Sequence, residues 1–299
     1  MAQDDVIKRQ TIIINYLRTG GKSFEDIQNH LEIESEIQSA DLRISQRTFQ
    51  RDITAIRRIY GIDIVFNRTK KVYEIDFEDT NPNTDRLMDS FALFNALNVG
   101  KQMEKFIQFE DKKTQGVHFI LDIITAIKNS NIIELYHKKY DEDNFKTYLL
   151  MPLMIKEYRY RWYLVAKEKN SDKIKTFGLD RILKLDILNE KYEYPKDFDA
   201  QNYFNDFYGV ITLDNVKTEN IVLSFTSFQG KYIKSLPMHH SQKILSDNDK
   251  ELRISLKLKP TIDFIMDLQY FGECVKVIKP LWLAEKIKNN FKKAVDNYK

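Results

Sequence analysis

The sequence predicts an α+β protein that contains several domains. Apolar residues recur at helical spacing over residues 4–60, alternate with the period of strands between residues 131 and 182, and then mix both periods up to residue 299. A length of 299 residues is enough for two or three domains, and an apolar content of 42% is enough for packed cores.

Two helices are predicted at the start of the chain. Residues 4–18 carry apolar side chains at helical spacing, and the pair Gly20-Gly21 ends this helix. Ser23 can cap a second helix that runs through Leu31. The stretch from Glu32 to Leu42 then connects it to the next helix.

A third helix and a β-hairpin follow. Ser45 caps this helix, and Gly61 stops it. Residues 62–66 and 73–75 alternate apolar and polar side chains around a turn at 67–70, which is typical of a β-hairpin. Three helices followed by a hairpin predict a winged helix-turn-helix domain over residues 1–78. The apolar stripe of the third helix consists of Phe49, Ile53, Ile56 and Tyr60.

The charge of this region is unevenly distributed. Residues 1–42 carry four Lys or Arg against eight Asp or Glu, whereas residues 43–71 carry eight Lys or Arg against Asp52 and Asp63. A basic block of this kind fits an anionic polymer, and it also fits a solvated helix face. The net charge of the whole chain, +3, gives no such indication.

The polar face of the third helix carries the residue types that read DNA. Arg reads guanine, Gln reads adenine, and Ser, Thr, Lys or Arg anchor phosphates. Cations at the hairpin turn suit a wing that touches the DNA backbone or minor groove. The alternatives are that Arg51 and Asp52 pair with neighbouring charges, and that Arg57 and Arg58 are only solvated. The predicted DNA-binding residues are Ser45, Gln46, Arg47, Thr48, Gln50, Arg51, Arg57, Arg68 and Lys70.

The rest of the chain divides into four further segments. Residues 79–130 begin with a polar linker and continue with helical spacing, which predicts a helical linker. Residues 131–190 contain five short strands with polar turns, a pattern compatible with a small β-barrel. A Tyr-rich connector at 191–209 leads to an α/β segment at 210–299. This last segment predicts strands at 221–226, 242–247, 250–258 and 274–278, and helices at 229–235, 260–268 and from Pro280.

A cluster of cations and aromatic residues lies within the predicted barrel strands. Trp162 and Tyr163 should face opposite sides of their strand, with Trp162 in the core and Tyr163 exposed. An Arg beside an aromatic ring and a second cation can hold a phosphate and a base together. Asp180 and Arg181 could instead form a purely structural ion pair. The candidate ligand-binding residues are Tyr136, Lys156, Arg159, Tyr163, Lys175 and Arg181.

Several short motifs occur in the order that characterises a known family. Ile44 to Ile53 resembles the recognition helix of winged-helix regulators that usually precede a WYL domain, and Ile233 to Gln242 and Phe271 to Pro280 resemble the C-terminal extension of such regulators. The WYL domain itself is named for its Trp-Tyr-Leu triplet. The motifs that resemble it are Met151-Pro152-Leu153, Arg161-Trp162-Tyr163-Leu164, Ile174-Lys175-Thr176-Phe177 and Asp180-Arg181-Ile182.

The resemblance implies a ligand-sensing module inside a bacterial transcription regulator. Its Sm-like β-barrel would bind an anionic ligand, with a nucleotide or single-stranded nucleic acid as the main candidates. The sequence departs from the family pattern in two places. The stretch Glu32–Leu42 is longer than the usual connection of a helix-turn-helix, and Lys175 stands where the family commonly has Arg. Because Lys is a point charge and not a planar fork, the phosphate geometry should differ.

These observations predict a cytoplasmic regulator that binds a double-stranded DNA operator as a homodimer, with no cofactor and no enzymatic activity. The alternative is an RNA- or single-strand-binding accessory protein that acts through the barrel. A hydrolase that uses His240 with Ser241 and Asp247 is disfavoured because the chain lacks nucleophile-elbow glycines.

Other classes of protein find little support. His239 and His240 are adjacent and should point to opposite faces of an extended segment, so no metal site is predicted. The single cysteine, Cys274, is expected to be buried, and it cannot form an intramolecular disulfide, which fits a reducing compartment. The acidic residues after Met1 do not resemble a signal peptide, and no apolar run reaches the length of a membrane span.

Overall fold

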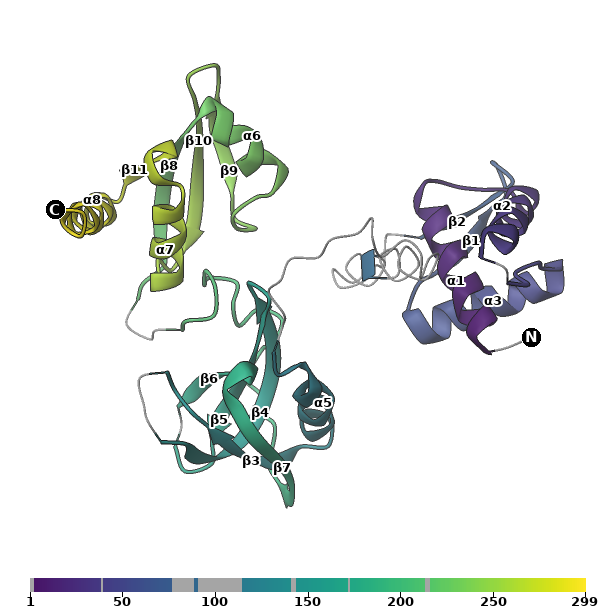
Figure 1. Cartoon of the computed structure of the whole chain (residues 1–299), viewed down its shortest axis with the longest axis horizontal. Coiled ribbons are helices and arrows are strands. Elements are labelled where there is room, and N and C mark those ends of the chain that lie inside the picture. The colour runs from purple at the N-terminus through teal and green to yellow at the C-terminus, as the bar shows by residue number, and fades with distance from the viewer. Residues whose placement is uncertain are drawn as a thin grey trace. The chain divides into compact units, whose positions relative to one another are not determined.

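The structure is a computed structural model of the whole chain (Figure 1). It describes residues 3–38, 40–76, 89–90, 115–140, 144–171, 173–212 and 216–299. The chain divides into two compact units, residues 1–110 and residues 111–299. Most of the predicted helical linker at 79–130 lies outside the described residues, which include only 89–90 and 115–130 of it.

Residues 3–76 of the first unit, the part of its N-terminal region that the structure describes apart from residue 39, form three helices followed by a two-stranded antiparallel hairpin, which is the predicted order of elements. Ile64 pairs with Ile75 at one end of the hairpin, and Asn67 pairs with Val72 at the turn. Ser45 begins the third helix, because its side chain accepts a hydrogen bond from the Thr48 N–H at 3.2 Å. The elements are α1 (Gln3–Arg18), α2 (Phe24–Gln38), α3 (Gln46–Tyr60), β1 (Ile64–Asn67) and β2 (Val72–Ile75).

Helix α2 is longer than the sequence predicted. It begins after Ser23, whose hydroxyl accepts the Asp26 N–H at 3.1 Å, but it continues to Gln38 and does not end at Leu31. The predicted long connection at 32–42 is therefore wrong, because only residues 39–45 join α2 to α3. The extension escaped detection because it buries no apolar stripe: Ile33 and Ile37 are each 56% exposed.

The core of the first unit is formed by the inward faces of all three helices and the hairpin. Phe49 and Ile56 from α3 are fully buried against Leu17 and Leu31, and Ile53 and Tyr60 pack partly against the same cluster. The predicted stripe of α3 therefore does face the core. Gly61 follows in the left-handed conformation at φ 66° and ends the helix as predicted.

The second unit begins with a curled five-stranded antiparallel sheet in the order β6-β5-β4-β3-β7. Strands β6 and β7 are the two edges of this sheet, yet only the three-residue turn Leu179–Arg181 separates them in the chain. Because consecutive Cα atoms are about 3.8 Å apart, the two edges must lie close together, and the sheet must curl. The strands are β3 (Asn131–His137), β4 (Lys146–Tyr158), β5 (Arg161–Glu168), β6 (Ile174–Gly178) and β7 (Ile182–Lys191).

Helix α5 (Ile120–Lys128) packs against this sheet. Its buried residues Ile123 and Ala126 join Leu135, Leu164 and the other inward-facing side chains of the strands. Trp162 packs against the same core, as the alternation of its strand predicted. Five strands in the predicted region confirm that part of the fold.

The C-terminal segment is a second sheet with helices on one face, in the β-α-β-β-α-β order. The strand order is β11-β8-β10-β9, and all neighbours are antiparallel. The predicted elements are found with ends shifted by at most two residues. They are β8 (Glu219–Thr226), α6 (Ser227–Ser235), β9 (Lys243–Asp247), β10 (Glu251–Leu258), α7 (Ile262–Tyr270), β11 (Val275–Lys279) and α8 (Leu281–Asp296).

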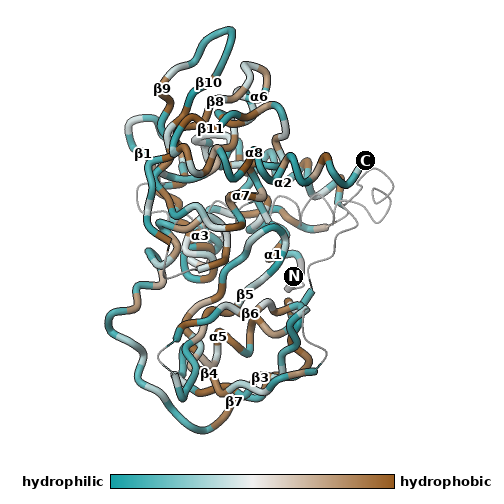
Figure 2. The backbone as a smooth tube through the Cα atoms, turned by 90° about the vertical axis from the view of Figure 1, so that its left-hand side faces the viewer, coloured by the Kyte–Doolittle hydropathy of each residue, from teal (hydrophilic) through white to brown (hydrophobic). Residues whose placement is uncertain are grey.

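Alternation of side chains along β8 and β10 builds the core of this segment. Leu223 and Ile254 lie opposite each other in the sheet and are fully buried with Phe264 and Leu283 from the helices. The turn between β9 and β10 is hydrophilic (Figure 2). Among the described residues, no helix combines the length and the apolar character needed to cross a bilayer.

The Tyr-rich connector is bound to the five-stranded sheet. Tyr194 donates a hydrogen bond to the carbonyl oxygen of Leu153 at 3.0 Å, and Tyr192 donates one to that of Pro152. Tyr192 also forms a small buried cluster with Ile132 and Leu153. The connector is therefore held to β4 before the chain enters the C-terminal segment.

Candidate functional site

The exposed face of α3 carries most of the predicted DNA-binding side chains. A shallow depression on this face is lined by side chains from three successive turns of the helix. Among the described residues, Arg47, Arg51 and Arg58 make no ion pair within 4 Å, so their charges are available to a partner. The lining residues are Arg47, Gln50, Arg51, Thr54, Ala55 and Arg58.

Other predicted residues are already engaged within the unit. Ser45 and Thr48 interact through their hydroxyls at 3.0 Å, which adds to their capping role. Arg57 lies 2.6 Å from Asp63, and Lys70 lies 3.9 Å from Glu74. Arg68 is exposed at the hairpin turn.

Both predicted glutamines contact the hairpin. The side-chain amides of Gln46 and Gln50 donate to the phenol oxygen of Tyr73 at 3.4 and 3.2 Å. Tyr73 belongs to β2, and its ring packs edge-on against Phe49 of α3. No pattern in the sequence indicates this contact, because Tyr73 is 23 residues from Gln50 and has the features of an ordinary strand residue.

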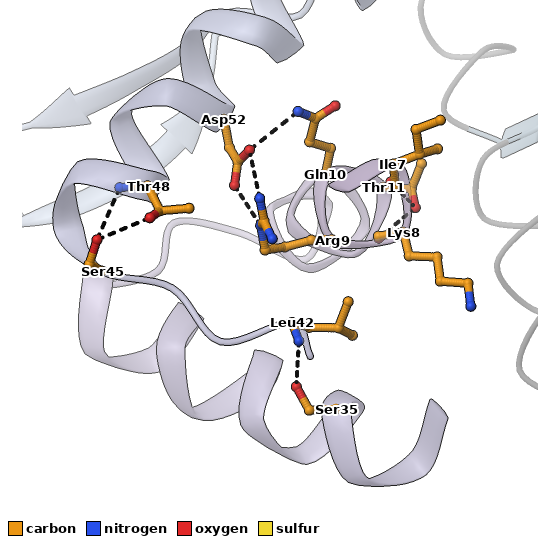
Figure 3. Close-up of polar contacts among 10 residues, drawn as sticks. All are labelled: Ile7, Lys8, Arg9, Gln10, Thr11, Ser35, Leu42, Ser45, Thr48 and Asp52. Carbon is orange, nitrogen blue, oxygen red and sulfur yellow. Dashed lines mark hydrogen bonds and ion pairs between the residues drawn. The ribbon is translucent and has the colours of Figure 1, made fainter. Parts of the chain in front are cut away.

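A buried ion pair joins α3 to α1 (Figure 3). Arg9 donates to both carboxylate oxygens of Asp52, at 2.7 and 3.2 Å, and Gln10 donates to one of them at 3.3 Å. The side chains of Arg9 and Asp52 are 3% and 5% exposed. The alternative that Asp52 pairs with a neighbouring charge therefore holds, whereas Arg51 is exposed and makes no ion pair among the described residues.

The second candidate site is a cavity of about 670 Å³ in the five-stranded sheet. It brings together three of the six residues that the sequence predicted, Tyr163, Lys175 and Arg181. They come from β5, β6 and the turn after β6, and the register sets Tyr163 opposite Gly178 and Lys175 opposite Ala166. The remaining lining residues are His137, Lys139, Tyr148, Ile174, Thr176, Phe177, Val210, Ile211 and Thr212.

Arg181 is only loosely paired with the carboxylate beside it in the chain. Its Nε lies 3.7 Å from Asp180, whereas Arg161 and Tyr140 donate to Asp180 at 2.8 and 3.0 Å. Asp180 therefore uses Arg161 as its main partner. The guanidinium of Arg181 lies 5.0 Å from the centre of the Tyr140 ring. Its buried Nε–H has no hydrogen-bond partner among the described residues and can therefore donate to a bound molecule.

Lys175, by contrast, has a close partner. Its ammonium lies 2.7 Å from the carboxylate of Glu168 and 5.8 Å from the centre of the Tyr148 ring. Because Glu168 neutralises part of its charge, Lys175 contributes less free positive potential to the cavity than Arg181 does.

His137 is an unexpected member of this cavity. It is 3% exposed, and burial together with the neighbouring Arg181 lowers the pKa of its imidazole to about 4. The ring is therefore neutral near pH 7 and offers one donor and one acceptor. The backbone of Gly178 acts on the pKa of the imidazole in the opposite direction, but among the described residues no partner meets hydrogen-bond geometry at either ring nitrogen or at the hydroxyl of Thr176. Buried polar atoms without partners are rare, so they mark a place where a bound molecule can supply them.

The wall formed by residues 210–212 is fixed by helix α7. The backbone N–H groups of Val210 and Ile211 donate to one carboxylate oxygen of Asp263, at 2.9 and 3.0 Å. One turn further along α7, Asp267 accepts a hydrogen bond from Tyr208. No local sequence pattern predicts this wall, because its first residue, Val210, lies 19 residues beyond the end of β7 at Lys191.

The other three predicted ligand residues lie outside the cavity. Arg159 forms an ion pair with Asp267 of α7. Lys156 lies 3.7 Å from the centre of the Phe204 ring, and burial lowers its pKa to about 8 although Asp263 acts in the opposite direction. Tyr136 has the ammonium of Lys184 at 5.9 Å from its ring centre. Arg159 and Lys156 thus connect the sheet with the segments that follow it.

The prediction that His239 and His240 point to opposite faces of an extended segment is wrong, because their ring centres lie 4.2 Å apart at a turn. His239 lies 2.8 Å from the Ser241 hydroxyl, and His240 lies 2.8 Å from the carbonyl oxygen of Asn205. Asp247 pairs with Lys234 at 2.7 Å. Among the residues that the structure describes, no group of three or more His, Cys, Asp or Glu could hold a metal ion.

Comparison with known families gives a match that coincides with the sheet and its cavity. The family described as WYL domain matches residues 118–187. The chain contains a WYL domain. This match includes α5, strands β3 to β6 and the first six residues of β7, whereas residues 210–212 of the cavity wall lie outside it.

Two solved structures are similar to this chain at low identity. One is proteasome accessory factor B/C (PafBC) of Arthrobacter aurescens, with 17% identity, a TM-score of 0.37, and coverage of 98% of this chain and 47% of that one. The chain therefore spans about half the length of that protein. The other is a CRISPR Cas-related protein, with 13% identity, a TM-score of 0.41, and coverage of 98% and 84%. No curated protein matches the sequence.

Proposed function

We propose that this protein is a DNA-binding transcription regulator whose WYL domain senses an anionic ligand. The observation that carries the proposal is the cavity in which Tyr163, Lys175 and Arg181 meet the partnerless polar atoms of His137 and Thr176. A cavity of about 670 Å³ lies within the range of small-molecule sites, and its mixture of rings, cations and neutral polar groups is typical of them.

The residues suggest how an anionic ligand would be held. Arg181 would contact a phosphate through charge-assisted hydrogen bonds. The rings of Tyr148 and Tyr163 would pack against a base, while the neutral imidazole of His137 would exchange hydrogen bonds with its polar edge. A nucleotide or the end of a single-stranded nucleic acid satisfies all of these groups.

The first unit supports the DNA-binding half of the proposal. Its three helices and hairpin suit a winged helix-turn-helix, with α3 as the recognition helix and the β1–β2 turn as the wing. The charges of Arg47, Arg51 and Arg58 are exposed on α3, and Arg68 extends the basic surface to the turn. Specific readout would come from Arg47 and Gln50, which lie one turn apart near the start of the helix.

Regulation requires that the ligand distinguish two states. We propose a cytoplasmic homodimer on a double-stranded operator, with two arrangements that differ in the spacing of the recognition helices. The ligand must bind one arrangement more tightly than the other, because equal affinities would shift nothing. In this scheme the protein acts by binding, without catalysis and without a cofactor.

The proposal is tested by measuring operator binding before and after ligand addition. A preferred duplex is first selected from genomic fragments, and nucleotides and single-stranded oligonucleotides are then added as probes. We expect the wild-type protein to change its duplex affinity with one probe class, and Arg181→Ala to bind the duplex normally but not respond. Lys184→Ala, which removes a cation of β7 outside the cavity, is the control and should respond fully.

Two outcomes would contradict the proposal. In the first, Arg181→Ala lowers both the melting temperature and duplex binding, while Lys175→Glu still responds fully to the ligand. Arg181 and Lys175 would then stabilise the sheet and would not bind the ligand. A protein that prefers single strands over every duplex would instead be an RNA- or single-strand-binding accessory protein acting through the barrel.

A further inference from the structure

The contact between the hairpin and the start of α3 places one hydroxyl against two base-reading side chains. Gln46 and Gln50 are one helical turn apart and exposed, and both donate to the phenol oxygen of Tyr73. Long side chains on an exposed helix face normally sample several rotamers. Here the two amides share one fixed acceptor.

Tyr73 itself has little freedom to move. Its ring lies 4.8 Å from that of Phe49 and 4.9 Å from that of Phe66, and the residue is 8% exposed. Its backbone is bound on both sides, because it pairs with Phe66 in β1 and exchanges hydrogen bonds with Lys22 at 2.7 and 2.9 Å. The phenol oxygen is therefore held at a defined position beside α3.

We infer that Tyr73 is a specificity-determining residue, which orients Gln46 and Gln50 for reading DNA bases before DNA is bound. The inference rests on the proposed DNA-binding function of this unit. A phenol oxygen can accept one N–H from each amide, and each amide keeps its carbonyl oxygen and a second N–H. Those two groups are the pair that a glutamine uses for bidentate contact with adenine.

Orientation before binding should sharpen discrimination between base pairs. Fixing a rotamer-rich side chain during association has an entropic cost, and a side chain that is already oriented avoids much of this cost. The saving applies only where the fixed geometry matches the base, so a wrong base gains nothing. Tyr73 should therefore influence the ranking of duplexes more than the average affinity.

The test is Tyr73→Phe in the full-length protein, because this change removes the hydroxyl and keeps the ring between Phe49 and Phe66. A random duplex library is selected with both proteins, and the preferred duplex and its single-base variants are then measured. We expect the melting temperature and the affinity for random duplex to stay unchanged. Discrimination at the base pairs that the two glutamines read should fall about three- to tenfold.

A second comparison separates orientation from packing. In a Gln46→Ala/Gln50→Ala background the hydroxyl has no amide to orient, so Tyr73→Phe should have no further effect on base ranking. Arg68→Ala, at the hairpin turn, is the control: as a phosphate contact it should weaken all duplexes equally.

Each outcome decides between the possibilities. A wild-type protein without preference among duplexes would refute the proposed function, and the inference with it. A wild-type protein that prefers one duplex, beside a Tyr73→Phe variant with the same ranking, would refute the inference alone. A lower melting temperature with proportional loss on all duplexes would make the hydroxyl a purely structural group.

Discussion

The buried ion pair between Arg9 and Asp52 should respond very differently to single and double substitution. Arg9→Met leaves the buried Asp52 carboxylate with Gln10 as its side-chain partner among the described residues, and Asp52→Leu removes the carboxylate to which Arg9 donates two hydrogen bonds. Breaking a buried pair in this way typically costs about 3–5 kcal/mol, because an uncompensated charge stays in the interior. That is a large part of the roughly 5–15 kcal/mol that stabilises a typical domain.

The double variant Arg9→Met/Asp52→Leu removes both charges at once. Because apolar replacements of similar size avoid the cost of desolvating two ions, such exchanges are often neutral or stabilising. We therefore expect the double variant to regain most of the stability that either single variant loses. Its interaction free energy should be several kcal/mol, well above the roughly 0.3–0.5 kcal/mol by which independent sites deviate from additivity.

Native-state hydrogen exchange on the full chain measures this without unfolding the second unit. Each 1.4 kcal/mol corresponds to tenfold in an equilibrium constant, so protection of the most slowly exchanging amides in α1 and α3 should fall about a hundred- to several thousandfold in the single variants. Amides of β8 and β10 serve as an internal reference and should not change. Single variants that lose less than about tenfold, or a double variant that loses the sum of both, would refute the reasoning.

Three further predictions concern the DNA-binding helix α3, the cavity of the five-stranded sheet and the proposed dimer. Arg47→Ala should lower specific duplex binding by roughly 1–3 kcal/mol and relax preference at one base pair, whereas equal loss on random duplex would demote Arg47 to a phosphate contact. Because the pKa of His137 falls to about 4 in the folded state from an ordinary 6.5, the unfolded chain binds more protons between these pH values, so stability should decline as the pH falls through this window. Chemical unfolding of the wild type and of His137→Phe at pH 7.5 and pH 4.5 measures this loss of stability, which should be at most about 3 kcal/mol larger in the wild type. The same change in the free energy of unfolding for both proteins would contradict the prediction. Light scattering should give a dimer, and footprinting should give half-sites about 34 Å or a multiple apart, while a monomer on a single half-site would exclude the proposed assembly.

Local chemistry explains which elements could be predicted from the sequence. Helix α3 could be predicted from the Ser45 cap, an apolar stripe and Gly61, because these three signals belong to the helix itself or to the residues next to its ends. The extension of α2 has no such signal. It is held by contacts such as the Ser35 hydroxyl, which accepts the Leu42 N–H at 3.0 Å while Leu42 is buried, and these depend on the tertiary fold (Figure 3).

The candidate cavity was predictable only in part for the same reason. Strand alternation is local, so it identified Tyr163 as the ring facing away from the core. That Lys175 and Arg181 line the same cavity as Tyr163 depends on the tertiary fold. Sequence adjacency suggested Asp180 as the partner of Arg181, but Arg161, 19 residues earlier, binds Asp180 more closely. The partnerless nitrogens of His137 become visible only when burial is known.

The hydrogen bonds from Val210 and Ile211 to Asp263 bear on how this sensor could be exchanged between proteins. Gly209 precedes them at φ 82°, and a Cβ atom there would lie 2.3 Å from the same carboxylate, so only glycine allows the approach. A chimera that transplants residues 118–187 alone would carry the floor of the cavity without this wall. The unit of exchange is therefore the strands together with Gly209, Asp263 and the helix that bears it, and ligand preference should travel with that larger piece.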